Sequence, residues 1–189
     1  MDFNKIIDSR SSVNSFSSKK PSWKPVMLAI DAALQGPFAG NRNNLKFIIV
    51  EDKNTIKSLA KHSNQSWISE TKLAIVVISD DTILENLYGE KGRVYSRQQA
   101  GAAIQTVLFK LVDQKLSACW VGSYTDEIIK QLLKIPAHMQ IEAIIPVGYA
   151  KHKQKKKRKV ELSNSVNWEE YGMNRRPSLT EEHGIKELD

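Results

Sequence analysis

The sequence predicts an α+β or α/β domain of three layers, with helices packed on a central sheet. Short apolar runs typical of buried strands alternate along the chain with segments whose apolar residues recur at helical spacing. The chain has 189 residues, of which 41% are hydrophobic and 26% charged, so it can bury a core without disulfides or metal ions. We expect one domain over residues 1–172 and a polar tail over residues 173–189.

The first clear helix is expected at residues 23–35. Pro25 fits its first turn, where a missing N–H does no harm, and Gly36-Pro37 ends it. Further along the chain, strands are expected at residues 45–51, 73–79, 116–121 and 141–149, and helices at residues 54–61, 81–88, 98–115 and 125–133.

Single residues add detail at three of these elements. Asp80 or Asp81 is expected to cap the helix at residues 81–88. Thr125 is expected to cap the helix at residues 125–133. Pro146 has no N–H for a strand ladder, so the last strand is expected to lie at an edge or to carry a bulge.

The helix at residues 98–115 has the clearest pattern. Its apolar face consists of Ala100, Ile104, Val107, Leu108, Leu111 and Val112. Small residues crowd its first turns at 100–103, and these allow the close approach of either another backbone or a flat ligand.

Charge is concentrated in one place. Lys plus Arg minus Asp plus Glu is 28 − 21 = +7, and the run at residues 151–159 (KHKQKKKRK) carries seven of those positive charges. The remainder is neutral, which argues against a general polyanion binder.

Cys119 is the single cysteine, no apolar run is long enough for a membrane span, and the first residues lack a signal-peptide core. We therefore expect a cytoplasmic protein with no membrane partner.

Several kinds of catalytic motif are absent from the sequence. It has no G-x-G-x-x-G, no G-x-x-x-x-G-K-[ST] and no G-x-S-x-G, and its four histidines lie far apart without neighbouring ligands for zinc. If the chain is an enzyme, a cofactor is expected to supply the difficult chemistry.

Three polar segments are candidates for one binding site. Residues 10–16 (RSSVNSF) offer an arginine and two hydroxyls that suit a phosphate; the alternative is a helix N-cap by Ser11 or Ser12. Residues 37–47 contain asparagines that suit a ring edge with carbonyl and N–H groups; the alternative is turn chemistry. Residues 118–124 end a strand at Gly122, where a backbone N–H can approach a ligand or simply form a turn.

Together these segments resemble the nitroreductase family of FMN-dependent oxidoreductases, over roughly residues 5–172. Six motifs correspond in order. The first three are residues 10–16 to R-R-S-x-R-x-F, 41–47 (NRNNLKF) to N-R-Q-P-W-x-F, and 98–108 (QQAGAAIQTVL) to Q-D-x-x-A-A-x-Q-N-x-x-L. The last three are residues 115–124 (KLSACWVGSY) to G-L-x-S-C-W-I-G-x-F, 145–149 (IPVGY) to I-P-x-G-Y, and 156–168 to K-x-R-x-x-x-L-x-x-x-V-x-W.

The resemblance implies a three-layer α/β/α sandwich with a mostly antiparallel sheet, in an intertwined homodimer with FMN at the interface. It implies that NADH or NADPH gives hydride to the flavin, which then reduces a nitroaromatic, a quinone or a related acceptor. The implied site residues are Arg10, Ser12, Lys156 and Arg158 at the FMN phosphate, Asn41 and Asn43 at the pyrimidine edge, and the N–H of Val121 or Gly122 near flavin N5. No catalytic side chain is implied.

This sequence also departs from the family pattern. Ser11 and Asn14, both counted among the cofactor-binding residues, stand where the family often has basic residues. Asn14 supplies no charge, so reduced flavin is expected to be less stabilised. Asn44 and Leu45 replace the usual Pro and Trp, and Thr106 the usual Asn.

Two alternatives to nitroreduction stay open. The first is another flavin-dependent task, either dehalogenation or flavin breakdown. The second is nucleic-acid binding through the basic run, which is less favoured because the run has no interleaved aromatic residues and no second basic stripe.

Overall fold

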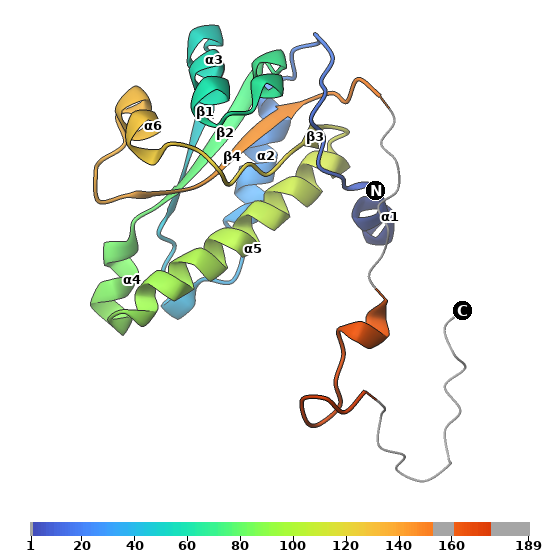
Figure 1. Cartoon of the computed structure of the whole chain (residues 1–189), viewed down its shortest axis with the longest axis vertical. Coiled ribbons are helices and arrows are strands. Elements are labelled where there is room, and N and C mark those ends of the chain that lie inside the picture. Colours follow the sequence, from blue (N-terminus) through green and yellow to red (C-terminus); the bar gives the residue numbers. More distant parts are fainter. Residues whose placement is uncertain (1, 153–160, 175–189) are drawn as a thin grey trace. The chain divides into compact units, whose positions relative to one another are not determined.

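The computed structural model describes residues 2–152 and 161–174, and Figure 1 shows the chain coloured along its sequence. The chain divides into two compact units between residues 154 and 155. The first unit contains the sheet and helices α1 to α6, and residues 161–174 of the second contain a short helical turn, η3 (Leu162–Asn164). The domain boundary expected at residue 172 stays a prediction.

An antiparallel sheet forms the centre of the first unit. The described strands are ordered β1 (Leu45–Val50), β2 (Leu73–Ser79), β4 (Gln140–Gly148) and β3 (Ser117–Ala118), and each neighbouring pair is antiparallel. Leu45 pairs with Ser79 at one end of the sheet. At the other end Leu73 pairs with Val147, which also pairs with Ala118. The antiparallel arrangement confirms the expected α+β class.

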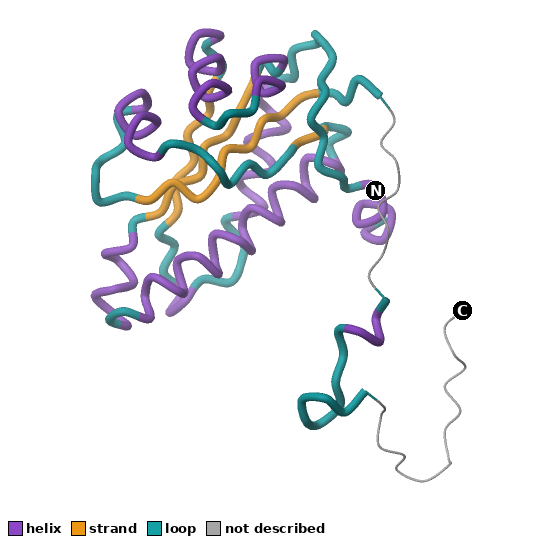
Figure 2. The backbone as a smooth tube through the Cα atoms, in the orientation of Figure 1, coloured by secondary structure: helices purple, strands orange, loops and turns teal. Residues whose placement is uncertain are grey.

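Both faces of the sheet are covered, which explains why β2 is apolar throughout. Its alternate residues Leu73, Ile75 and Val77 join one core cluster, with residues of α2 (Trp23–Ala33) and α5 (Lys91–Asp113). Ala74, Val76 and Ile78 join a second cluster, with α3 (Lys53–His62), η2 (Ser66–Glu70) and α6 (Asp126–Leu133). Figure 2 shows the strands between these two groups of helices. The predicted three-layer α/β/α sandwich is therefore confirmed.

Local capping explains where several helices begin. The Ser22 hydroxyl accepts a hydrogen bond from the Lys24 N–H at 3.3 Å, and Pro25 lies in the first turn of α2 as expected. Asp80, not Asp81, caps α4 (Asp81–Tyr88) by accepting from the Thr82 N–H at 3.1 Å. Thr125 stands at the N-cap of α6, but its side chain makes no capping hydrogen bond.

The long helix α5 begins at Lys91, seven residues before the expected start. Its first turns are polar, so hydrophobic periodicity could not reveal them. They are fixed by packing, because Gly92 lies directly against the backbone of α4: a Cβ on Gly92 would lie 2.4 Å from the Leu84 carbonyl carbon. The helix α1 (Phe3–Ser9) was also not expected. The ring of Phe3 packs edge-on against that of Phe109 in α5, with the two ring centroids 5.7 Å apart.

The expectations about the last strands met different outcomes. The strand expected at 116–121 is reduced to the two residues of β3. Pro146 lies in β4, which is an interior strand and not an edge, opposite Ala74 of β2. The expected alternative, a bulge, is present in β4: Val77 pairs with Ala143 and Ile78 with Ile141, so the register shifts at Glu142 and not at Pro146 itself. Pro146 is tolerated because β3 has already ended: only the Cys119 N–H approaches its carbonyl, at 3.4 Å.

The described residues contain no helix with both the length and the apolar character of a membrane-spanning segment.

Candidate functional site

Residues 10–16, called the arginine segment below, follow α1 and lie beside the edge of the sheet. Ser12 forms an isolated parallel bridge with Ala118 of β3, and the Val13 N–H donates to the Ala118 carbonyl at 3.1 Å. Phe16 bridges to Ala150 just beyond β4. The first and third candidate segments of the sequence are therefore adjacent in space.

Successive side chains of the arginine segment alternate between the protein interior and the solvent, and the polar ones face the solvent. Val13 and Phe16 are buried, whereas Ser12 and Asn14 are exposed and Arg10 is half-buried. The alternative role of this segment as a helix N-cap is wrong, because Ser22 caps the next helix.

Phe16 fixes the end of the arginine segment on the sheet. Its ring lies over Gly148, where a Cβ would come within 2.8 Å of Phe16 Cδ1. The ring stacks with Trp67 at 6.2 Å, and the Phe16 N–H donates to the Glu70 carboxylate at 3.1 Å. Gly148 therefore has a packing role: it makes room for the aromatic residue that holds the segment down.

The two backbone donors predicted after β3, at Val121 and Gly122, differ in whether they are engaged. The Val121 N–H donates to the Ile144 carbonyl at 2.9 Å, so it is already engaged. Gly122 is exposed, and within residues 2–152 and 161–174 its N–H has no hydrogen-bond partner. A Cβ on Gly122 would meet nothing closer than Trp120 Nε1 at 3.9 Å. Of the two predicted donors, Gly122 is the one that a ligand can reach.

Residues 39–44, called the asparagine loop below, connect α2 to β1 through the short turn η1 (Ala39–Asn41). Gly40 and Asn41 both have left-handed backbone angles, each with φ of 56°. The side chains of Asn41 and Asn43 are exposed, but the Asn43 Oδ1 accepts from the Leu45 N–H at 2.8 Å. The oxygen of Asn43 is therefore already partly engaged, whereas among the described residues Asn41 has no side-chain partner and keeps its full donor and acceptor capacity.

The asparagine loop and the arginine segment lie at opposite ends of the sheet. The loop enters β1 at Leu45, which pairs with Ser79 at the last residue of β2. Ser12 lies beside Ala118, whose partner Val147 pairs with Leu73 at the first residue of β2. The length of β2 between these two levels corresponds to about 20 Å at the usual rise of a strand. One chain therefore brings together two of the three candidate segments and separates the third.

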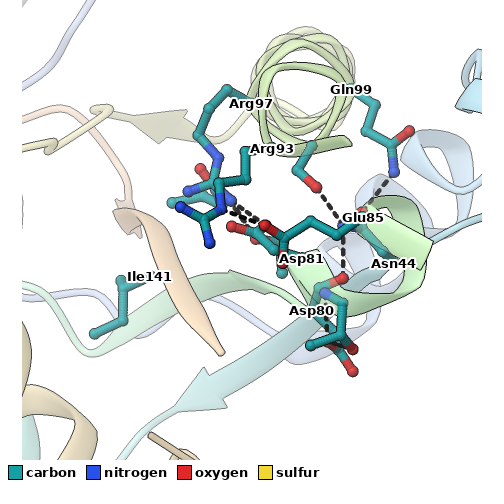
Figure 3. A network of polar contacts seen from close by, with 12 residues as sticks. Asn44, Asp80, Asp81, Glu85, Arg93, Arg97, Gln99 and Ile141 are labelled. Carbon is teal, nitrogen blue, oxygen red and sulfur yellow. Dashed lines mark hydrogen bonds and ion pairs between the residues drawn. The ribbon is translucent and has the colours of Figure 1, made fainter. Parts of the chain in front are cut away.

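A charge cluster of two largely buried carboxylates and a partly exposed arginine lies at the loop end of the sheet (Figure 3). Arg97 of α5 pairs with Asp81 at the start of α4 and, at 3.0 Å, with Glu142 of β4. Ser79 donates a hydrogen bond to Glu142. Burial raises the pKa of Glu142, an effect that the Ser79 hydrogen bond and the Arg97 charge oppose. The cluster ties β2, β4, α4 and α5 together.

Lys156 and Arg158, the predicted phosphate-binding residues of the basic run, lie outside the described residues. Their role stays a prediction.

Three polar residues near the asparagine loop are buried, a role that was not predicted from the sequence: Asn44, Ser96 and Gln99. A signal was present for two of them. Ser96 and Gln99 fall on the same helical face as Ala100 and Ile104. The buried face of α5 therefore extends toward the N-terminus of the helix, where it consists of polar residues. Polar side chains at buried helix positions need hydrogen-bond partners, and here these partners lie in the loop.

Comparison with known proteins identifies the family. The model of the nitroreductase family matches residues 7–82 and 64–149. A relative from Methanothermobacter thermautotrophicus, named "Putative NADH dehydrogenase/NAD(P)H nitroreductase", is 27% identical over 79% of this chain and 78% of its own length. An iodotyrosine deiodinase from Thermotoga neapolitana is 23% identical over 74% of this chain and 84% of its own length.

The fold agrees with this match. The solved structure of an FMN-dependent nitroreductase from Clostridium difficile superposes with a TM-score of 0.76, at 20% identity, over 88% of this chain and 98% of that one. Fold, motif order and family match thus point the same way, and the chain belongs to the nitroreductase family.

Proposed function

We propose that this chain is an FMN-dependent oxidoreductase that takes hydride from NADH or NADPH and reduces a nitroaromatic, a quinone or a related acceptor. Membership of the nitroreductase family carries the proposal. The names of its relatives, an NAD(P)H nitroreductase and an FMN-dependent nitroreductase, support the donor and the cofactor.

The donor set of the arginine segment fits the phosphate of FMN. The Arg10 guanidinium and the Ser11 and Ser12 hydroxyls have no hydrogen-bond or ion-pair partners among the described residues, and no carboxylate lies within the segment. A phosphate of about two negative charges suits such a set, because guanidinium contacts to phosphate are charge-assisted and often bidentate. Lys156 and Arg158 are proposed to complete this phosphate site.

The remaining donors suit the rim of a flavin ring. Bound flavin would supply the atom that accepts and donates hydride, so the protein needs no catalytic acid or base of its own. The Gly122 N–H is open to donate to the N5 side of that ring. Asn14 would hydrogen-bond the N1/O2 edge without adding charge, and Asn41 would hold the pyrimidine edge with one donor and one acceptor.

The geometry of a single chain favours a site shared by two copies. Asn14 and Asn41 are both proposed at the polar edge of the same ring, yet they lie near opposite ends of the sheet. One ring edge cannot touch both across a sheet that is about 20 Å long. We therefore propose a homodimer in which the arginine segment of one copy and the asparagine loop of the other form each site.

Cofactor content tests the proposal most simply. The purified protein is expected to be yellow, to release FMN on denaturation, and to oxidise NADH or NADPH when a nitroaromatic or a quinone is present. Comparing both nicotinamides against a panel of acceptors would identify the preferred pair. A colourless protein that takes up no added FMN would contradict the proposal.

The deiodinase relative favours a second candidate, reductive removal of a halogen from a halogenated phenol. This reaction uses the same flavin site but releases halide. Halide release from iodotyrosine in the presence of reduced flavin, with slow turnover of nitroaromatics and quinones, would establish the second candidate over the first.

A further inference from the structure

The side chain of Gln99 joins the two ends of the asparagine loop to α5. Its Oε1 accepts a hydrogen bond from the Ala39 N–H at 3.1 Å, and its Nε2 donates to the Arg42 carbonyl at 3.3 Å. The same Nε2 also donates to Oδ1 of Asn44. Gln99 is only 4% exposed, so water does not compete for these contacts.

Asn44 and Ser96 extend the contact into the core, as Figure 3 shows for Asn44 and Gln99. The Asn44 Nδ2 donates to the Ser96 hydroxyl at 2.8 Å and to the Asp80 carbonyl at 3.0 Å. Asn44 is 2% exposed and Ser96 is fully buried. Each amide oxygen and nitrogen of Gln99 and Asn44 therefore has a partner, as a buried polar network requires.

The backbone of the loop has a specific shape that these contacts hold in place. Gly40 and Asn41 both have left-handed angles, which glycine adopts freely and asparagine tolerates better than most residues. Tyr88 restrains the loop from another side: a Cβ on Gly40 would lie 2.5 Å from the Tyr88 hydroxyl. The bonds within the turn, such as Asn41 N–H to the Phe38 carbonyl at 2.9 Å, do not connect it to the rest of the domain.

Two members of the network stand where this chain departs from the family pattern. Asn44 occupies the position of a proline and Gln99 that of an aspartate. A proline has no side-chain amide to accept from residue 99, so the contact between Asn44 and Gln99 depends on the substitution at position 44.

We propose that Gln99 is a positioning residue that fixes the asparagine loop so that Asn41 meets the ring edge of bound flavin. Asn44 and Ser96 hold Gln99 and the loop in register. This inference rests on the proposed flavin site, because Asn41 needs a ring to position against. Gln99 itself touches no ligand.

The test replaces Gln99 with methionine, which keeps the length of the side chain but removes all three of its hydrogen bonds. Binding of FMN and of riboflavin is measured by flavin fluorescence, and amide hydrogen exchange is followed at residues 39–44. Affinity for both flavins is expected to fall about tenfold, since the ring edge and not the phosphate loses its contact. Exchange at the Ala39 N–H is expected to rise.

A matched control separates positioning from loss of stability. Ile104→Val shortens a fully buried core residue on the same helix and removes none of the hydrogen bonds to the loop; it is expected to leave flavin affinity and loop exchange unchanged. If Gln99→Met does not fold, the same flavin-binding and exchange measurements are made on Gln99→Asn. This variant keeps the amide group but shortens the side chain by one methylene, so the amide no longer reaches the loop.

The outcomes separate the inference from the proposed function. If the unmodified protein binds neither flavin, the proposed function fails, and with it the positioning role. If it binds FMN but the folded Gln99 variant binds both flavins with unchanged affinity, the inference alone is overturned, even if loop exchange rises. A loss of affinity for FMN but not for riboflavin would also overturn it.

Discussion

The two ends of the sheet hold their candidate binding residues in different ways. The arginine segment is held by backbone contacts of Ser12 and Val13 and by the buried ring of Phe16, so its polar side chains take no part in the fold. The asparagine loop is held by buried side chains of α5, above all Gln99. At the first end, a ligand-facing side chain can therefore be removed without loosening the fold. At the second, the supporting side chains affect stability and binding together.

The largest effect is expected from glycines at the two ends. Gly92→Ala places a Cβ 2.4 Å from the backbone of Leu84, whereas Gly148→Ala places one 2.8 Å from the Phe16 ring, which can turn aside. Overpacking typically costs about 1–3 kcal/mol, and we expect Gly92→Ala at the upper end and Gly148→Ala at the lower. Urea unfolding measures both. A greater loss for Gly148→Ala would show that the arginine segment is the more rigid end.

Arg10→Ala tests whether the side chains of the arginine segment are free to bind. It removes a charge-assisted phosphate contact of about 1.5–3 kcal/mol, so affinity for FMN should fall about ten- to a hundredfold. Riboflavin, which lacks the phosphate, should bind as before, and the urea midpoint should not move. Lys5→Ala on α1 serves as the exposed control. Equal losses for FMN and riboflavin would mean that Arg10 does not contact the phosphate.

Glu142 should make the loop end of the sheet sensitive to pH. Because burial raises the pKa of Glu142 above the ordinary 4.5, the folded state favours its protonated form. Its contribution to stability is therefore fully present below pH 4.5 and is lost as pH rises through the raised pKa.

Glu142→Gln should weaken the dependence of the free energy of unfolding on pH in this range. Glu127→Gln, on the exposed side of α6, should leave that dependence unchanged. Urea midpoints measured across that pH range check the difference. Parallel profiles for the unmodified protein and Glu142→Gln would show that this carboxyl does not link pH to folding.

The smallest effect is expected from Asn14→Lys, which adds a positive charge at the outward face of the arginine segment. Near reduced flavin an exposed charge contributes about 1 kcal/mol, so the two-electron potential should rise by ~20 mV. A spectroelectrochemical titration of the FMN-loaded variant measures the potential. An unchanged potential would place Asn14 away from the N1/O2 edge.

Local signals explain which elements the sequence predicted well. The apolar run of β2 lies within that strand, and the capping residue Asp80 directly precedes α4; both elements have the expected bounds. The start of α5 and the length of β3 depend on contacts made far along the chain, with α4 and with β4, so no local pattern revealed them.

The same distinction applies to the site. The types of candidate residues could be predicted because the order of the motifs indicates them, and Ser12 lies beside Ala118, on the segment that continues to Gly122. The separation of Asn41 from Asn14 could not be read from spacing, since it follows from strand order. The support of the loop by Gln99 arises from tertiary packing, although its polar character on a buried face was visible in the sequence.

The central claim is that the two ends of the sheet, taken from different copies of the chain, form one flavin site. Co-expression of an Arg10→Ala chain with an Asn41→Gly chain tests it, because glycine keeps the left-handed backbone while removing the side chain. Each variant alone should bind FMN weakly. The mixed dimer, isolated by separate affinity tags, should regain one site of unmodified affinity, since one site then has neither substitution. If no tight site appears in the mixed dimer, both residues act within the same chain and the shared site is wrong.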